Sequence, residues 1–279
     1  MTAAAIVVWI TIFFLGASLG SFLNVCIARW PAEESVVRPR SRCPKCGHEI
    51  AWYDNIPIIS WLLLRARCRG CGAPISAQYP AIELVVGLMW VAAAYWFGLG
   101  FTAVRVAIAA TILLGVVMTD LKHYVIPDGF TVTGFLIAVL APLVAAFIGE
   151  QGPFVGPWEA VIGACTGAGL IAIVGWLGEV ALGKEAMGQG DVTLMAMIGA
   201  MVGPVGSFLT VFVAAGIGSA AFLAIVAPIG ALRAKRRGEP FELPLVPFGV
   251  FLAPAGLVTL LFGEPMIAKY LVYIGAAAS

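Results

Sequence analysis

The sequence has few charged residues and few cysteines. Charged residues make up 11% of its 279 positions and hydrophobic residues 61%, whereas a soluble domain is about one quarter charged and about half apolar. This balance excludes an ordinary soluble domain and indicates a protein of the lipid bilayer. Six cysteines are too few for a disulfide scaffold. A net charge of +1 points to no particular partner, and we expect no nucleic-acid partner.

The sequence also lacks a recognisable cleavable signal peptide. Residues 4–28 have no basic segment before them, and their apolar run is long enough to span a membrane. Further apolar stretches of about 20 residues follow, separated by polar interruptions. The predicted spans are residues 4–27, 79–98, 101–119, 129–148, 157–182, 192–204, 206–231 and 247–276. We therefore predict an all-α polytopic membrane protein with about eight transmembrane helices, the last of them kinked or partly inserted at Glu264-Pro265.

The basic residues are distributed very unevenly along the chain. With eight spans, one side of the membrane receives the loops 29–78, 120–128, 183–191 and 232–246. These loops hold fourteen of the sixteen Lys and Arg residues, and only Arg105 and Lys269 lie elsewhere. The positive-inside rule then places the four loops in the cytosol and both termini outside. No internal repeat of the transporter type is visible.

The first of these loops contains two pairs of cysteines with the CxxC spacing. The pairs are Cys43 with Cys46 and Cys68 with Cys71, each followed by a glycine that permits the tight turn. Four thiolates in two such turns form the usual tetrahedral site of a structural zinc ion. In the reducing cytosol, metal binding is favoured over disulfides. The weaker alternatives are a redox couple, four unrelated thiols, or His48 as a competing ligand.

Acidic residues within or beside apolar spans are functional candidates by default, because a charge in a bilayer is costly. Two have ordinary structural interpretations: Glu83 as an acid in the first helical turn and Asp128 as an N-cap. Asp120 and Asp191 are harder to explain in this way. Asp120 ends the third span, and Asp191 opens the sixth, directly after a glycine-rich segment.

The charge distribution places both aspartates at the same face of the membrane, where they can meet. Two carboxylates that share a site do not both ionise easily, so one holds a proton while the other acts as a base. Such a pair can activate water and protonate a leaving amine, which is the chemistry of peptide hydrolysis. Gly188 and Gly190 would let an extended substrate approach Asp191 closely. Helix capping and proton-coupled transport are the alternatives that the residues alone leave open.

The ordered set of motifs resembles the type IV prepilin peptidase family, the bifunctional leader peptidases and N-methyltransferases of pilus and type II secretion systems. The resemblance runs along nearly the whole chain. Its motifs are Gly20–Val25 (GSFLNV), Ser41–Gly47 (SRCPKCG), Tyr53–Pro57 (YDNIP), Leu64–Cys71 (LRARCRGC), Tyr79–Glu83 (YPAIE), Thr119–Asp120, Ile126–Asp128 (IPD), Glu185–Asp191 (EAMGQGD) and Pro247–Gly249 (PFG).

The resemblance implies a membrane aspartic peptidase with Asp120 and Asp191 as its catalytic pair. It also implies cleavage of prepilin or pseudopilin leaders at the cytosolic face of the bacterial inner membrane. The newly exposed N-terminal residue is then methylated from S-adenosylmethionine, an activity tied to the cysteine loop with its Zn²⁺. Supporting positions are Gly188, Gly190, Pro127, Asp128 and Lys122. The expected organisation is a first span (1–28), a zinc-binding loop (29–78) and a peptidase core (79–279).

One position departs from the family pattern. Thr193 stands where the family usually has a lysine. The surroundings of the aspartate pair are therefore less positive than is usual in the family, and Lys122, Lys184 or His123 could supply the missing charge. Asn24, at the inner end of the first span, is interpreted as an interhelical hydrogen-bonding residue. The alternatives are a peptidase without methylation, which the cysteine loop argues against, and a transporter or assembly protein that docks partners through its zinc loop. The sequence leaves the oligomeric state open.

Overall fold

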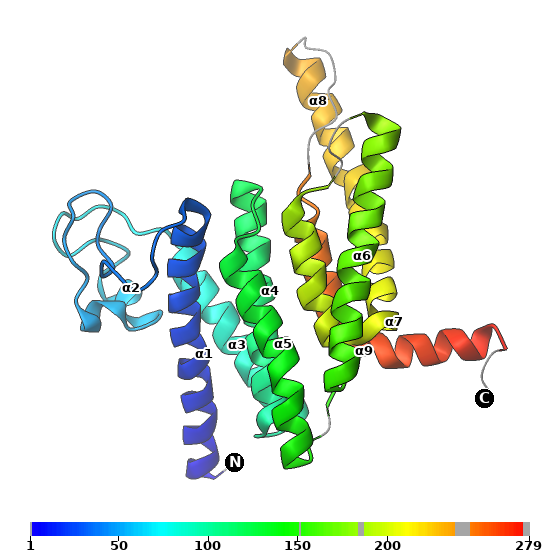
Figure 1. Ribbon diagram of the computed structural model, residues 1–279. Coiled ribbons are helices and arrows are strands. Elements are labelled where there is room, and N and C mark those ends of the chain that lie inside the picture. The colour runs from blue at the N-terminus through cyan, green and yellow to red at the C-terminus, as the bar shows by residue number, and fades with distance from the viewer. Residues whose placement is uncertain (1, 151, 184–186, 238–245, 276–279) are drawn as a thin grey trace. The chain divides into compact units, whose positions relative to one another are not determined.

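The computed structural model describes residues 2–150, 152–183, 187–237 and 246–275, and this part of the chain is helical (Figure 1). Two isolated β-bridges occur in the cysteine loop. The helices are α1 (Ala3–Arg29), the 3₁₀ turns η1 (Trp30–Ala32) and η2 (Trp52–Asn55), α2 (Ile59–Leu63), α3 (Gln78–Phe97), α4 (Phe101–His123), α5 (Asp128–Ile148), α6 (Pro157–Leu182), α7 (Gln189–Ala221), the π-helical η3 (Phe222–Val226), α8 (Ala227–Arg237) and α9 (Gly249–Tyr273). The predicted all-α class is confirmed.

Seven helices in the described part are long and apolar enough to cross a membrane. The sixth of these, residues 189–236, would be about 70 Å long as one straight helix, more than twice the bilayer core. It is interrupted at Gly203, whose φ of 76° is left-handed. Ser207 Oγ lies only 2.9 Å from where a Cβ on Gly199 would be, although residues eight apart in a straight helix are about 12 Å apart. The chain therefore turns back at Gly203, which yields the predicted sixth and seventh spans.

The chain forms two compact units, Met1–Gly115 and Val116–Ser279. In the first unit, α1 packs along α3. A glycine on each helix makes room for a large side chain of the other helix. A Cβ on Gly16 would lie 2.8 Å from Trp90, and one on Gly87 would lie 2.7 Å from Phe13. Close contact through small residues is the usual way in which helices associate in lipid.

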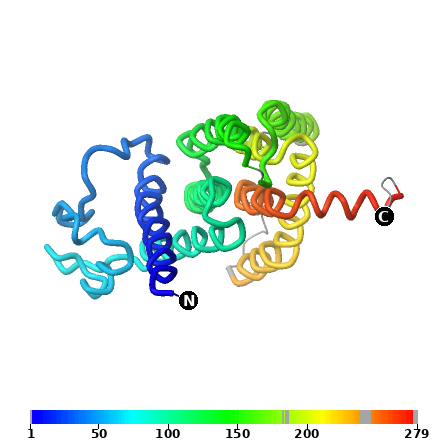
Figure 2. The backbone as a smooth tube through the Cα atoms, turned by 90° about the horizontal axis from the view of Figure 1, so that it is seen from below, coloured from blue at the N-terminus to red at the C-terminus, as the bar shows by residue number. Residues whose placement is uncertain are grey.

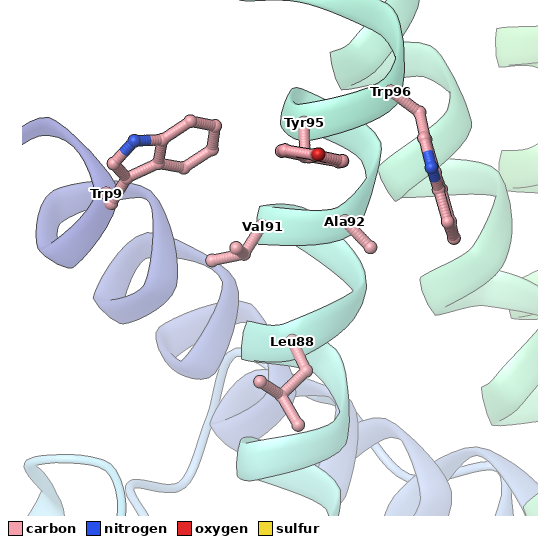
Figure 3. A pocket seen from close by; sticks show the side chains of 6 residues that line it. All are labelled: Trp9, Leu88, Val91, Ala92, Tyr95 and Trp96. Carbon is pink, nitrogen blue, oxygen red and sulfur yellow. The ribbon is translucent and has the colours of Figure 1, made fainter.

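An apolar hollow lies on the surface between α1 and α3 (Figure 3). Trp9 faces it from α1, and the other lining residues come from α3: Leu88, Val91, Ala92, Tyr95 and Trp96. Aromatic side chains near helix ends are typical of the boundary between bilayer and water. The hollow contains none of the predicted site residues.

In the second unit, α7 packs against α5, α6 and α9. The backbones of α6 and α7 touch at Gly163 and Gly199, where a Cβ on either residue would meet the carbonyl oxygen of the other. α9 contains Pro254 and Pro265, and both views show its C-terminal part turned away from the rest of this unit (Figures 1 and 2). The predicted kink in the last span is confirmed.

Two interpretations of acidic residues were wrong. α3 begins at Gln78, so Glu83 lies beyond its first turn, and its side chain is buried. The N-cap residue of α5 is Pro127, while Asp128 is the first helical residue and its side chain is exposed. In both cases the helix begins at a different residue from the one that the acid suggested.

Candidate active site and metal centre

The four thiols of the loop lie together in the first unit. The Sγ atoms of Cys43, Cys46, Cys68 and Cys71 are all within 4.8 Å of one another. Cys43 Sγ is 3.9 Å from Cys71 Sγ, and Cys46 Sγ is 4.0 Å from Cys68 Sγ. Four sulfurs around a zinc ion at about 2.3 Å are separated by about 3.8 Å. The four side chains therefore have the spacing of a tetrahedral metal site.

Each cysteine pair lies on the same kind of backbone turn. The N–H of Gly47 donates to the carbonyl of Cys43, and the N–H of Gly72 donates to that of Cys68, both at 2.9 Å. The two glycines have φ values of 72° and 69°, as the sequence predicted. Backbone N–H groups of Cys46 and Lys45 lower the pKa of the Cys43 thiol to about 6, which favours the metal-binding thiolate.

Side chains around the thiols brace the loop. The Arg69 guanidinium makes two bonds to the Asp54 carboxylate, at 2.7 and 2.6 Å, and stands over the Tyr53 ring. The Trp61 indole N–H donates to the carbonyl of Ile75. His48 is outside the thiol cluster and lies against Gly70, so the structure gives it no ligand position.

Asp120 lies in the last turn of α4, in the second unit. Its side chain is 5% exposed. The backbone N–H of Val250 donates to Asp120 Oδ2 at 3.1 Å, because α9 begins there and its first N–H groups have no partners within the helix. α4 ends at His123, and the N–H of Tyr124, whose φ is positive, donates to the Asp120 carbonyl.

Asp191 lies in the first turn of α7 and is half-buried. The charge of Asp120 acts on it directly, so the tertiary structure brings the two predicted acids into one site. Ile126 lies between the helix ends that carry this site. A Cβ on Gly190 would lie 3.0 Å from Ile126 Cβ, and one on Gly249 would lie 2.8 Å from Ile126 Cδ1.

The supporting positions differ in their surroundings. Gly188 has open space beside it, since the atom nearest to where its Cβ would be is Asp191 Oδ2, at 3.9 Å. Pro127 is buried, while Lys122 and His123 are exposed. Thr193 Oγ donates to the Gly190 carbonyl within α7. Lys184, named as a possible compensating charge, lies outside the described residues, as does Glu185.

Three residues of the site were not predicted to take part in it: Ile126, Gly249 and Val250. A Cβ on Gly249 would lie 2.7 Å from Asp120 Oδ2, so a side chain at this position would displace that carboxylate or the start of α9. The motif Pro247–Gly249 was recognised in the sequence, but the bond that the next residue, Val250, makes to Asp120, 130 positions away, has no local signal.

Comparisons with known proteins agree with this arrangement. Residues 14–97 match the family model described as the bacterial peptidase A24 N-terminal domain, and residues 106–224 match the type IV leader peptidase family. The prepilin leader peptidase/N-methyltransferase of Aeromonas hydrophila is 34% identical, over 93% of this chain and 92% of that protein. The chain belongs to the type IV leader peptidase family.

Other relatives in the type IV leader peptidase family carry the same name. The protein from Pseudomonas aeruginosa is 33% identical over 94% of this chain and 92% of its own length. The one from Myxococcus xanthus is 44% identical, but over 68% of this chain and 55% of its own length. No solved structure matches this chain. The N-terminal family model includes the four cysteines, and the peptidase model includes Asp120 and Asp191.

Proposed function

We propose that this protein cleaves the leader peptides of type IV prepilins or pseudopilins and then methylates the new N-terminal residue. The peptidase half is carried by one observation: Asp120 and Asp191 lie at neighbouring helix ends, close enough for the charge of one to act on the other, in a bundle of apolar helices. The methyltransferase half is supported by the names of relatives that align over more than nine tenths of the chain.

In the proposed hydrolysis the two aspartates divide the acid and base roles. The ionised carboxylate takes a proton from water as the water oxygen attacks the scissile carbonyl carbon, and the protonated carboxyl donates its proton to the carbonyl oxygen. The C–N bond then breaks as a proton passes from the pair to the leaving nitrogen, which becomes the new N-terminal amine. The N–H of Val250 holds the Asp120 carboxylate in one orientation. Gly188 leaves space beside Asp191 for an extended substrate backbone. Lys122 lies in the last turn of α4, two residues after Asp120, and is proposed as the basic residue that compensates for Thr193.

The proposed metal is one zinc ion held by Cys43, Cys46, Cys68 and Cys71. The sulfur spacing fits a tetrahedral site, and four protein ligands leave no open coordination position. The ion would therefore stabilise the loop and take no part in bond breaking. The methyl donor is proposed to be S-adenosylmethionine.

The proposed location is the inner membrane of a bacterium, with the active site facing the cytosol and both termini outside. The support is the charge distribution: the loops assigned to the cytosol hold fourteen of the sixteen Lys and Arg residues. Asp120 and Asp191 adjoin two of these loops. A cytosolic site also suits S-adenosylmethionine, which is a soluble methyl donor.

The test is reconstitution of the purified protein in lipid vesicles with a prepilin and methyl-labelled S-adenosylmethionine. We expect a shortened pilin that carries the label on its N-terminal residue. An uncleaved prepilin would contradict the proposal. Cleaved but unlabelled pilin would leave a peptidase without methylation.

A further inference from the structure

A cluster of polar side chains at the junction of α1, α3 and the cysteine loop belongs neither to the aspartate pair nor to the thiols. We call Ser21, Asn24 and Glu83 the acceptor cluster. A Cβ on Gly20 would lie 2.8 Å from Glu83 Cα, so α1 and α3 touch at this level. Both Asn24 and Glu83 are more than nine tenths buried, with exposures of 5% and 8%.

The hydrogen bonds of the cluster leave acceptor atoms in excess. Glu83 Oε2 accepts the N–H of Ile58 at 2.7 Å, and the Ser21 hydroxyl also bonds to this carboxylate. A carboxylate has about four acceptor positions, so further donors can be added. The Asn24 amide group donates to the Tyr79 carbonyl at 3.1 Å, which confirms its predicted interhelical bond.

Asn24 Oδ1, by contrast, is buried without a hydrogen-bond partner in the described part of the chain. Buried polar atoms are nearly always paired, so an unpaired one points to a missing partner. No ion pair to Glu83 is found among the described residues either. An amide oxygen and a carboxylate that can both accept further donors fit a cationic group with several N–H bonds, such as a primary ammonium.

We infer that the acceptor cluster binds the α-amino group of the cleaved pilin and positions it for methylation. This inference rests on the methyl transfer in the proposed function. It gives the methyltransferase activity a site in the first unit, whereas the aspartate pair belongs to the second unit.

The chemistry requires a proton acceptor at this place. An α-ammonium group has a pKa of about 8 and cannot attack a methyl group until it loses a proton. In the inferred step, one ammonium proton passes to the Glu83 carboxylate. The nitrogen lone pair then forms the N–C bond to the methyl group of the sulfonium donor, while the C–S bond breaks and its electron pair remains on sulfur. The products are a methylammonium, a neutral thioether and a proton that leaves Glu83 for solvent.

The same cluster connects the site with the cysteine loop. Ile58 has a φ of 63°, which is rare for a β-branched residue, and the Glu83 carboxylate holds its N–H. Folding of the loop therefore determines where the donors to Glu83 lie. Methylation would therefore depend on a folded cysteine loop, even though no reaction takes place at the four thiols.

The experiment measures two activities of the full-length protein in vesicles. One assay follows leader cleavage of a prepilin, and the other follows methylation of a pilin peptide that already has its free N-terminus. We expect Glu83→Gln to lower the kcat of methylation by about 100-fold, the scale of general base catalysis, with leader cleavage unchanged. The substituted amide keeps an oxygen for the Ile58 N–H, so zinc content should stay at the wild-type level. Asn24→Leu should raise the KM for the peptide and leave the affinity for S-adenosylmethionine unchanged.

Ser18→Ala is the matched control, because the Ser18 hydroxyl bonds to the Phe14 carbonyl of its own helix. Wild-type methylation by Glu83→Gln would overturn the inference. So would loss of zinc in this variant, which would make Glu83 an anchor of the loop, or loss of S-adenosylmethionine affinity, which would make the cluster part of the donor site. If the wild-type protein cleaves the prepilin but never methylates the product, the proposed methyltransferase function is wrong. That result differs from loss of methylation in the variants alone, which is what the acceptor cluster predicts.

Discussion

In the unit Met1–Gly115 the clustered thiols come from two short turns of the same kind, whereas in the unit Val116–Ser279 the two acids come from helices that are far apart in the chain. The paired thiols are 22 and 28 positions apart, and each turn is completed by its own glycine. The bond between Asp120 and Val250 joins residues 130 positions apart. The thiol cluster therefore depends mainly on two short turns, whereas the arrangement of the aspartate pair depends on the packing of several helices.

The largest expected effect is loss of the metal. Structural zinc sites contribute about 10 kcal/mol or more to folding, so the double variant Cys43→Ser/Cys46→Ser should lose both its zinc and its methyltransferase activity. Leader cleavage should remain, because Asp120 and Asp191 belong to the other unit. Elemental analysis of the purified protein and the two activity assays measure this.

Cys165→Ser is the control for the metal, since Cys165 is exposed and outside the thiol cluster. Zinc retained by the double variant would show that the cluster is not the metal site. Loss of cleavage together with zinc would show that the two units do not function separately.

The next effect concerns the acids. Asp120→Asn and Asp191→Asn should each reduce leader cleavage by about 100-fold or more, because each removes one partner of the acid–base pair. Methylation of a peptide with a free N-terminus should continue in both variants. Glu179→Gln, an exposed acid on α6 of the same unit, serves as the control. Cleavage at the wild-type rate by either aspartate variant would rule out the pair.

A smaller effect is expected at the beginning of α9. Gly249→Ala places a methyl group 2.7 Å from Asp120 Oδ2 and should slow cleavage by about 10-fold, or about 1.4 kcal/mol, within the usual range for an overpacked site. Gly169→Ala is the matched control, since nothing lies within 4 Å of its Cβ position. Equal cleavage rates in the two variants would mean that α9 does not position Asp120.

The smallest effect concerns the brace between Asp54 and Arg69. Arg69→Lys keeps the charge but loses the paired bonds, which should destabilise the loop only slightly, because the ion pair is exposed to solvent on its arginine side. Zinc release on heating at pH 7 measures this. Arg69 holds the pKa of Asp54 below its usual range, so the ion pair stabilises the folded loop fully above about pH 4. That stabilisation is lost as the pH falls through the lower, folded-state pKa. If Arg69→Lys lowered the midpoint temperature of zinc release as much as the loss of a cysteine does, the effect of the ion pair would not be the smallest of these effects.

Much of the membrane fold was predictable, because apolar length and its interruptions are local properties of the chain. The spans that became α1, α3, α5 and α6 were predicted to within a few residues, and the turn at Gly203 lies close to the predicted boundary between the spans 192–204 and 206–231. Helix starts were less certain. Glu83 and Asp128 were given terminal roles, yet Gln78 and Pro127 mark those boundaries, since a helix can begin before or after an acid at little cost.

The sequence by itself predicted the cluster of four thiols, because residues three apart in a tight turn lie close together and two such pairs are the usual donor set for one metal ion. It also identified Asp120 and Asp191 as unusual, since a carboxylate beside an apolar span is costly. Only the tertiary structure decided that the two acids meet, that Ile126 lies between their helix ends and that Gly249 admits the Asp120 carboxylate. It also showed that Asn24 and Glu83 share one buried junction. These contacts depend on how helices far apart in the chain pack, and no local pattern of residues records that packing.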